Sequence, residues 1–172
     1  MDELIGLALK NFTVTMLIFG FVATAISLIK HSRVEPLTQA LVVEKLFAYF
    51  LLFSIGIGYL YNFIIHVFFA EMAAHFIGWA DSPFQYEVGF ASLGFGVVGV
   101  LAFRSSWGFR AAAVIAPAFF SWGAAAGHVY QMLTNHNFAP GNAGTVFWTD
   151  ILMPTFGLVL LYLQHRTTKT TR

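Results

Sequence analysis

The chain alternates between long apolar runs and short polar connections. A helix that crosses the hydrocarbon core of a bilayer needs about 20 consecutive, mostly apolar residues. Five segments of this chain reach that length. They are approximately Leu4–Ile29, Leu41–Ile77, Pro83–Phe103, Phe109–Leu133 and Gly144–Leu163. The pattern therefore predicts an all-α protein, a polytopic bundle of five transmembrane helices that forms a single domain over residues 1–172.

The second segment, Leu41–Ile77, is longer than a bilayer requires. As one helix it would extend for roughly 55 Å, against about 30 Å of hydrocarbon. We expect it to protrude at its charged start, Glu44 and Lys45, to tilt, or to bend near Gly56 and Gly58.

Composition supports the membrane assignment. Hydrophobic residues make up 58 % of the chain and charged residues 10 %, whereas a soluble domain carries about 25 % charged residues. The net charge of +1 gives no field that attracts nucleic acid, so no nucleic-acid partner is expected. The chain has no cysteine, which excludes disulfides, thiolate metal ligands and a cysteine nucleophile.

The basic residues predict the orientation, because Lys and Arg accumulate on the cytoplasmic side of a membrane protein. All but one of the nine Lys and Arg residues lie in the first connection, the third connection and the C-terminal tail. They are Lys30, Arg33, Lys45, Arg104, Arg110, Arg166, Lys169 and Arg172. With five crossings these regions share one side, so the N-terminus is predicted outside and the C-terminus in the cytoplasm.

Two local patterns predict how helices begin and pack. The run Ser82–Gln85 is typical of a capping box, with Ser82 as N-cap and the Gln85 side chain returning to it. Small residues recur in the third segment, including Gly94 and Gly99, and in the run Gly123–Gly127. Such faces favour close packing of helices, either within the bundle or with a second copy or another membrane protein.

Ionisable residues inside spanning helices are costly, and by default they indicate function. Counting from the predicted outer ends at 1.5 Å per residue places the groups on four helices roughly 5–10 Å deep in the outer leaflet. They are Glu71, His75, Glu87, His128 and Asp150. The sequence therefore predicts one buried polar site near the outer face.

Local spacing supports this hypothesis. Glu71 and His75 are four residues apart and share a helix face. Asp150 precedes Pro154 by four residues, so the proline leaves the carbonyl of residue 150 without its helical hydrogen bond. His66 is out of phase with His75 and is expected to pair elsewhere, with Asn62 as the candidate one turn away.

Two histidines and three carboxylates form a ligand set that suits Zn²⁺, Mn²⁺ or non-haem iron. In this hypothesis Glu71, His75, His128 and Asp150 bind a divalent metal. Glu87 is then the catalytic general base for a metal-bound water, and the substrate is a lipid or another membrane-soluble molecule.

Three alternatives remain open. The same groups could exchange protons in a carrier that couples protons to a small solute. They could also form a polar network that only holds helices together, in a structural subunit of a membrane complex. Haem b between His75 and His128 is a further, less favoured alternative, because three carboxylates would lie beside it.

Several motifs carry a resemblance to a known family. They are Glu71-x-x-x-His75, the run from Gly78-Trp79 through Ser82-Pro83-Phe84-Gln85 to Glu87 and Gly89, and Gly141-Asn142-Ala143-Gly144 ahead of Asp150. With these motifs the chain resembles an uncharacterised family of small bacterial polytopic membrane proteins. The resemblance runs from the second half of the second segment through the fifth. It implies a bacterial origin, and hence the inner membrane, but no activity.

Overall fold

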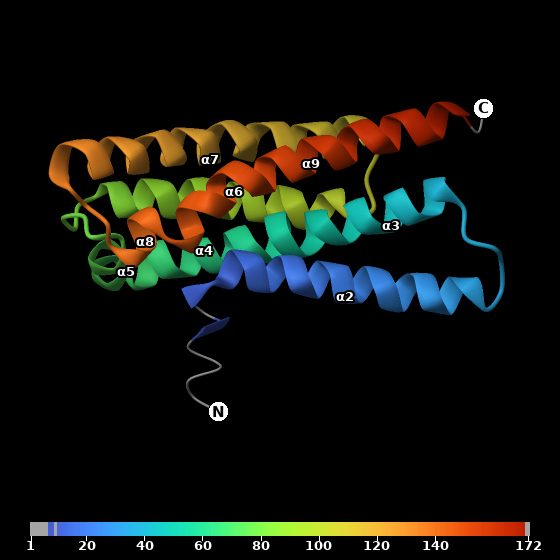
Figure 1. The fold of residues 1–172 in the computed structure, drawn as a ribbon, viewed down its shortest axis with the longest axis horizontal. Helices are drawn as coiled ribbons and strands as arrows, with labels where there is room; N and C mark the ends of the chain where they lie inside the picture. The colour runs from blue at the N-terminus through green and yellow to red at the C-terminus, as the bar shows by residue number, and fades with distance from the viewer. Residues whose placement is uncertain (1–6, 9, 171–172) are drawn as a thin grey trace.

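The computed structural model describes residues 7–8 and 10–170, and the elements in that range are helices. Five helical segments are long and apolar enough to cross a membrane, which confirms the predicted number. They run side by side along the long axis of the molecule (Figure 1). The five segments are Phe12–Ser32, Gln39–Phe68, Phe84–Ala102, Trp107–Asn135 and Pro140–Thr168. The part of the first predicted segment that lies in residues 4–6 and 9 falls outside the described residues.

The first span is α2 (Phe12–Ser32), the third is α6 (Phe84–Ala102) and the fourth is α7 (Trp107–Asn135). The fifth begins with the short α8 (Pro140–Ala143) and continues as α9 (Thr145–Thr170). Large apolar side chains on these helices, such as Phe119 at 70 % exposure, face outward. An exposed apolar surface of this kind is what lipid would cover.

The second span consists of three joined elements. It starts as α3 (Gln39–Phe50), changes to a π-helix, η1 (Leu51–Ile57), and continues as α4 (Gly58–Phe68). The change in hydrogen bonding falls in the region where a bend near Gly56 and Gly58 was expected. π-helical turns within longer helices are often found at functional sites.

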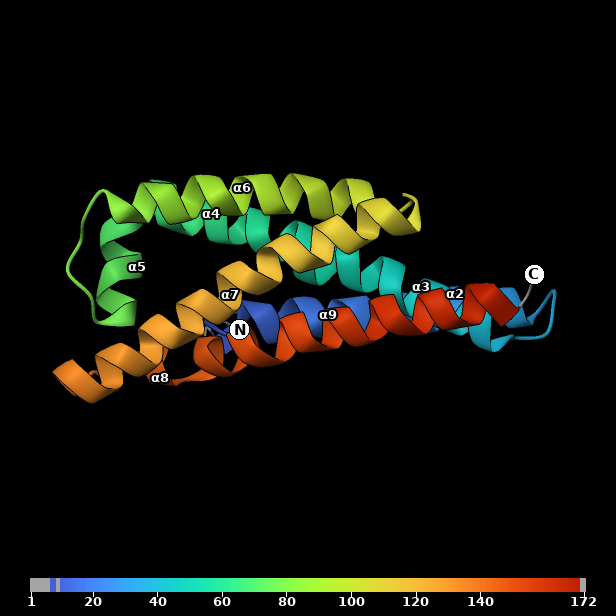
Figure 2. The same ribbon diagram turned by 90° about the horizontal axis from the view of Figure 1, so that it is seen from above.

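The prediction of one continuous helix from Leu41 to Ile77 is wrong beyond Phe68. The backbone breaks at Phe69, with φ −134° and ψ 40°, and α5 (Ala70–Ile77) begins as a separate helix. Figure 2 shows α5 lying across the end of the bundle instead of along it. Turning the chain here resolves the excess length, because residues 70–77 no longer have to continue through or beyond the bilayer.

The two ends of the bundle differ in what they contain. At one end, called here the α8 end, lie α5, α8 and the connections 78–83 and 136–139. At the other, called here the Arg110 end, lie the connections 33–38 and 103–106 and the last turns of α9. Between the two ends, apolar side chains fill the interior. The largest fully buried apolar side chains are Phe47, Leu51, Val114 and Leu160.

Glycines allow the second and third spans to approach closely. A Cβ on Gly99 would lie 2.6 Å from the backbone nitrogen of Gly56, a separation that only glycine permits. By contrast, a Cβ on Gly94 would meet nothing within 4 Å. The predicted small-residue face of the third span therefore serves packing at Gly99 but not at Gly94.

Candidate functional site

At the α8 end, six side chains with polar groups, from separate parts of the chain, form a continuous series of contacts that runs from the connection 78–83 toward the interior. This set is called here the His128 chain. Its members are Trp79, Asn142, His128, Asp150, Ser121 and Tyr59.

Asn142 organises the outer part of the His128 chain. It belongs to α8, is fully buried, and uses both ends of its amide. Its Nδ2 donates to the backbone oxygen of His128 (3.2 Å) and to that of Asn137 (2.9 Å). Its Oδ1 accepts from Trp79 Nε1 (3.0 Å) and contacts His128 Nδ1 (2.8 Å). Asn142 thus joins α8, α7 and the Trp79 connection at one point.

These contacts determine where the imidazole of His128 carries its hydrogen. The indole nitrogen of Trp79 can only donate, so the amide atom that it contacts must be the oxygen of Asn142. The same oxygen contacts His128 Nδ1, so Nδ1 is the protonated nitrogen. In a neutral imidazole the other nitrogen, Nε2, then holds the free lone pair.

His128 Nε2 faces the carboxylate of Asp150 on α9. The distance from Nε2 to Asp150 Oδ2 is 3.6 Å, and the side chains are 7 % and 19 % exposed. This separation is longer than a hydrogen bond, which lies between 2.7 and 3.2 Å for nitrogen and oxygen. The two groups are therefore close and largely shielded from solvent, but they do not share a hydrogen bond in this structure.

The His128 chain continues from Asp150 toward the middle of the bundle. Asp150 interacts with the hydroxyl of Ser121, which lies on α7. The Ser121 hydroxyl is in turn 2.8 Å from the hydroxyl of Tyr59 on α4. The ring of Tyr59 packs edge-on against Phe95 and Phe120. Polar contact thus ends at Tyr59, where aromatic side chains begin.

Of the five predicted site residues, the structure brings together His128 and Asp150. Glu71 and His75 are exposed on α5, and Glu87 is exposed on the first turn of α6. No group of three or more His, Asp or Glu side chains within residues 7–8 and 10–170 is arranged to hold a metal ion. The predicted convergence rested on depths counted along one helix to Ile77, and the break at Phe69 removes that basis for Glu71 and His75.

His66 and Gln85 form a second buried contact that the sequence analysis assigned differently. His66 Nδ1 lies 2.6 Å from Gln85 Oε1, and Asn62, its expected partner, instead donates to Ser92 (2.9 Å). Gln85 therefore does not return to Ser82 as a capping residue, and α6 starts without a side-chain cap. Both contacts join α4 to α6.

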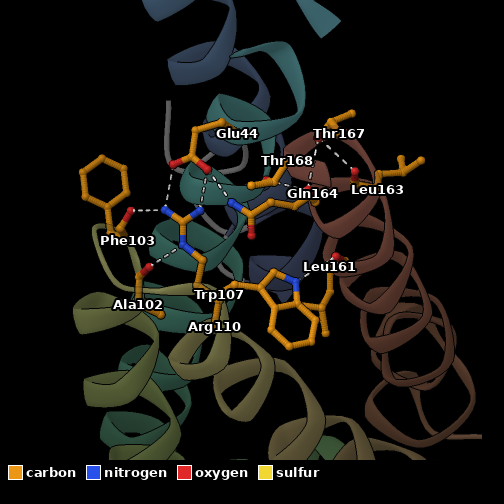
Figure 3. Close-up of polar contacts among 10 residues, drawn as sticks. All are labelled: Glu44, Ala102, Phe103, Trp107, Arg110, Leu161, Leu163, Gln164, Thr167 and Thr168. Atoms are coloured by element: carbon orange, nitrogen blue, oxygen red, sulfur yellow. Dashed lines mark hydrogen bonds and ion pairs between the residues drawn. The ribbon is translucent and has the colours of Figure 1, made fainter. Parts of the chain in front are cut away.

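The Arg110 end holds a polar cluster that the sequence analysis missed (Figure 3). Arg110 is 3 % exposed and donates to both carboxylate oxygens of Glu44, at 2.6 and 2.9 Å. It also donates to the backbone oxygens of Ala102 (3.0 Å) and Phe103 (2.8 Å). Gln164 on α9 donates to Glu44 as well. The cluster joins the second, fourth and fifth spans.

The sequence contains a signal for this cluster. Glu44 and Arg110 each lie near the start of an apolar segment. A charged side chain there is costly next to lipid unless a group of opposite charge pairs with it. Arg110 was interpreted only as an indicator of orientation, so its pairing with Glu44 was not predicted.

These features define a class: a polytopic helical membrane protein with a buried histidine–carboxylate pair at one end and, at the other, an arginine–glutamate pair whose arginine is buried. The chain belongs to the family of unknown function DUF6790, whose model matches residues 10–170. This confirms membership of an uncharacterised family. Comparisons with curated proteins and with solved structures give no match.

Proposed function

We propose that this protein is an inner-membrane carrier that couples protons to a small solute, with His128 and Asp150 as its proton-binding pair. The proposed orientation has the N-terminus outside and the C-terminus in the cytoplasm. Its support is that the basic connections and the C-terminal part of α9 share the Arg110 end, as the bias of Lys and Arg toward the cytoplasm requires (Figure 1). The His128 chain then begins at the outer face.

The observation that carries the proposal is the 3.6 Å gap between His128 Nε2 and Asp150 Oδ2. Asn142 Oδ1, which also accepts from Trp79, contacts Nδ1, so Nε2 is the nitrogen that can gain or lose a proton. A proton on Nε2 would have a carboxylate in front of it and would favour closing the gap. Proton binding would thus draw α7 toward α9.

A network that only holds helices together accounts less well for this gap. The other buried interhelical contacts are closed, at 2.6 Å for His66 and Gln85 and 2.9 Å for Asn62 and Ser92. Neither glutamine, asparagine nor serine changes its charge with pH. The His128–Asp150 pair differs in both respects, since it is open and both partners can change protonation state.

A divalent metal is the second candidate, and the same distance favours it. Two ligands that each lie about 2.1 Å from Zn²⁺ at a tetrahedral angle are about 3.4 Å apart. His128 Nε2 and Asp150 Oδ2, at 3.6 Å, are close to that separation, and the Nδ1 contact orients the ring as a metal-binding histidine requires. Haem is less well supported, because His75 lies exposed on α5.

Trp79 offers a direct readout of the proton site. Its ring lies 5.6 Å from that of His128, and a protonated imidazole quenches indole emission at such a distance. With Trp107, Trp122 and Trp148 replaced by phenylalanine, we expect Trp79 emission to fall as the pH is lowered through the histidine range. His128→Asn and Asp150→Asn should each remove this step, since one removes the proton acceptor and the other the balancing charge.

His66→Asn is the matched control, because it alters a buried histidine whose partner, Gln85, cannot ionise. This variant should keep the Trp79 response. Unchanged responses in both site variants would contradict the proton site. Elemental analysis of the same preparations tests the second candidate: stoichiometric zinc, manganese or iron that is lost in His128→Asn would favour the metal.

Coupling between proton movement and solute transport requires a separate measurement. Protein reconstituted in liposomes with an internal pH dye would be exposed to a panel of amino acids, sugars, carboxylates and cations. We expect at least one compound to drive proton movement in the wild type and not in Asp150→Asn. A Trp79 titration without any solute-driven proton movement would leave a proton site but reject the carrier.

A further inference from the structure

A cavity of about 530 Å³ opens at the Arg110 end, opposite the His128 chain. It lies between α3, the connection 103–106 and the neighbouring turns of α7 and α9. Its volume falls in the range of about 300–1,000 Å³ that is typical of small-ligand sites. Its walls combine basic, aromatic and amide side chains. Those used below are Lys45, Tyr49, Arg104, Trp107, Arg110 and Gln164.

The cavity has positive charge that its own residues do not balance. Lys45, Arg104 and Arg110 line it, against the one carboxylate of Glu44. Glu44 is bound by Arg110 at two points. Within the part of the chain that the structure describes, Lys45 and Arg104 form no ion pair, and the guanidinium of Arg104 lies over the ring of Phe103. Two cations are thus available to an anion.

Gln164 adds a hydrogen-bond acceptor. Its side chain is nine-tenths buried (9 % exposed), and its Nε2 donates to Glu44, which places the amide oxygen on the other side. In Figure 3 this oxygen points away from Glu44. Among the described residues Gln164 Oε1 has no hydrogen-bond partner, although it is shielded from solvent. A buried acceptor of this kind is costly unless a donor reaches it.

The position of the cavity indicates the kind of ligand. It lies where α3 and α7 begin and α6 ends, at the level where a spanning helix meets the headgroups. Trp107 and Tyr49 line it, and these residue types are enriched at the membrane interface. Trp107, at 44 % exposure, presents apolar surface at the cavity, and Leu101, at 58 % exposure, lies near the end of α6, two residues before the lining residue Phe103.

We infer that this cavity binds a phospholipid headgroup. The phosphate lies beside Lys45 and Arg104, and rotation of the Gln164 amide toward the cavity brings Oε1, which is shielded without the lipid, to a hydrogen-bond donor on the headgroup. The acyl chains follow the apolar surface of Leu101 and Trp107. Basic pockets between transmembrane helices are known to bind phospholipid headgroups on the cytoplasmic side, where this end is proposed to lie.

Comparing two lipids distinguishes the phosphate contact from the contact with Gln164. Phosphatidylethanolamine and phosphatidylcholine share the phosphate and the net charge, but only the former has N–H donors. Binding of each, with identical acyl chains, would be measured by native mass spectrometry on the purified, delipidated full-length protein. We expect phosphatidylethanolamine to bind about three- to tenfold more tightly, the effect of one hydrogen bond to a buried acceptor.

Two variants assign the contacts. Lys45→Gln with Arg104→Gln should weaken both lipids alike, by about fivefold for each cation removed. Gln164→Leu should bring the ratio of the two affinities to about one while leaving the binding of phosphatidylcholine largely unchanged. Lys30→Gln with Arg33→Gln is the matched control, because it removes two exposed cations from the same end but outside the cavity.

Two results would overturn the inference. One is lipid binding that the Lys45 and Arg104 changes leave as strong as the Lys30 and Arg33 control. The other is inorganic phosphate that displaces lipid at equal concentration, which would make this a site for a free anion. If Gln164→Leu does not fold, the Lys45 and Arg104 variant decides alone, since both side chains lie at the cavity and outside the Arg110–Glu44 contact.

Discussion

Two carboxylates lie among the helices at opposite ends of the bundle, and they are neutralised in different ways. Glu44 is held by Arg110 through two hydrogen bonds of 2.6 and 2.9 Å. Asp150 faces His128 across 3.6 Å. An arginine is charged at every pH that a cell experiences, whereas a histidine is charged or neutral depending on its surroundings. One pair is therefore permanent and the other conditional.

The partners of each pair add to this difference. Arg110 also donates to the backbone oxygens of Ala102 and Phe103, so four of the five N–H groups of its guanidinium are engaged. His128 has one nitrogen engaged by Asn142 and one that faces Asp150 without a hydrogen bond. A fully satisfied charge network makes a structure rigid, while an open contact leaves room for a change of state. We therefore expect the Arg110 end to contribute mainly to stability and the α8 end to carry the proposed proton exchange.

The largest expected effect is at the permanent pair. Glu44→Gln leaves the guanidinium of Arg110, which is 3 % exposed, without a balancing charge. We expect the free energy of unfolding to fall by about 3 kcal/mol, the low end for breaking a buried pair, because Glu44 itself is 44 % exposed. The loss should be equal at pH 6 and pH 8, since arginine is charged at both. Steric trapping in bicelles can measure it.

Two further variants show whether the loss comes from the uncompensated charge. Glu35→Gln breaks the contact between His31 and Glu35, which are 31 % and 69 % exposed, and should cost nearly nothing. Glu44→Leu combined with Arg110→Leu removes both charges and should recover part of the stability. A double variant less stable than Glu44→Gln would contradict the assignment.

The next effect concerns the residue that orients His128. Asn142→Ala removes two hydrogen bonds to backbone oxygens and leaves Trp79 Nε1 and His128 Nδ1 without their acceptor. We expect a loss of about 2 kcal/mol, the scale of leaving buried polar groups unsatisfied. The pH response of Trp79 should also become weaker, because the imidazole is no longer held.

Asn135→Ala is the control for Asn142→Ala. Asn135 is exposed and donates to the side chain of Gln131 at 2.6 Å, so its removal should change stability by less than about 0.5 kcal/mol. Equal losses for the two asparagine variants would show that Asn142 has no special role in the His128 chain.

The number and order of the spans could be predicted from the sequence because apolar length is a local property of the chain. The break at Phe69 could not, since no glycine or proline lies there to indicate it. It is stabilised by contacts distant in sequence: α5 packs on α8, with Gly141 against Phe76. That break moved Glu71 and His75 out of the predicted site.

The site was predictable to the same degree. His128 and Asp150 are ionisable residues in apolar segments, and that local contrast identified them. Asn142 and Trp79 lie in polar connections, where such residues are ordinary, and only the tertiary fold shows that Asn142 is buried. The motif Gly141-Asn142-Ala143-Gly144 was recognised, but nothing local to it indicates a partner on α7.

The smallest expected effect is at the conditional pair, and it is the decisive one for the comparison. Asp150→Asn is the same change of carboxylate to amide as Glu44→Gln, but here no hydrogen bond between the pair is lost, because the gap is 3.6 Å. We expect a loss of about 0.6 kcal/mol or less at neutral pH, in line with interhelical polar contacts in membranes. If Asp150→Asn instead costs as much as Glu44→Gln, the imidazole is permanently charged in the folded protein. The pair would then be a second structural ion pair, and the proposed proton exchange would lose its site. A small loss of stability in Asp150→Asn, together with loss of the Trp79 titration in that variant, would support the proton site. Only a pair that changes its charge can contribute little to stability at neutral pH and still determine the response to pH.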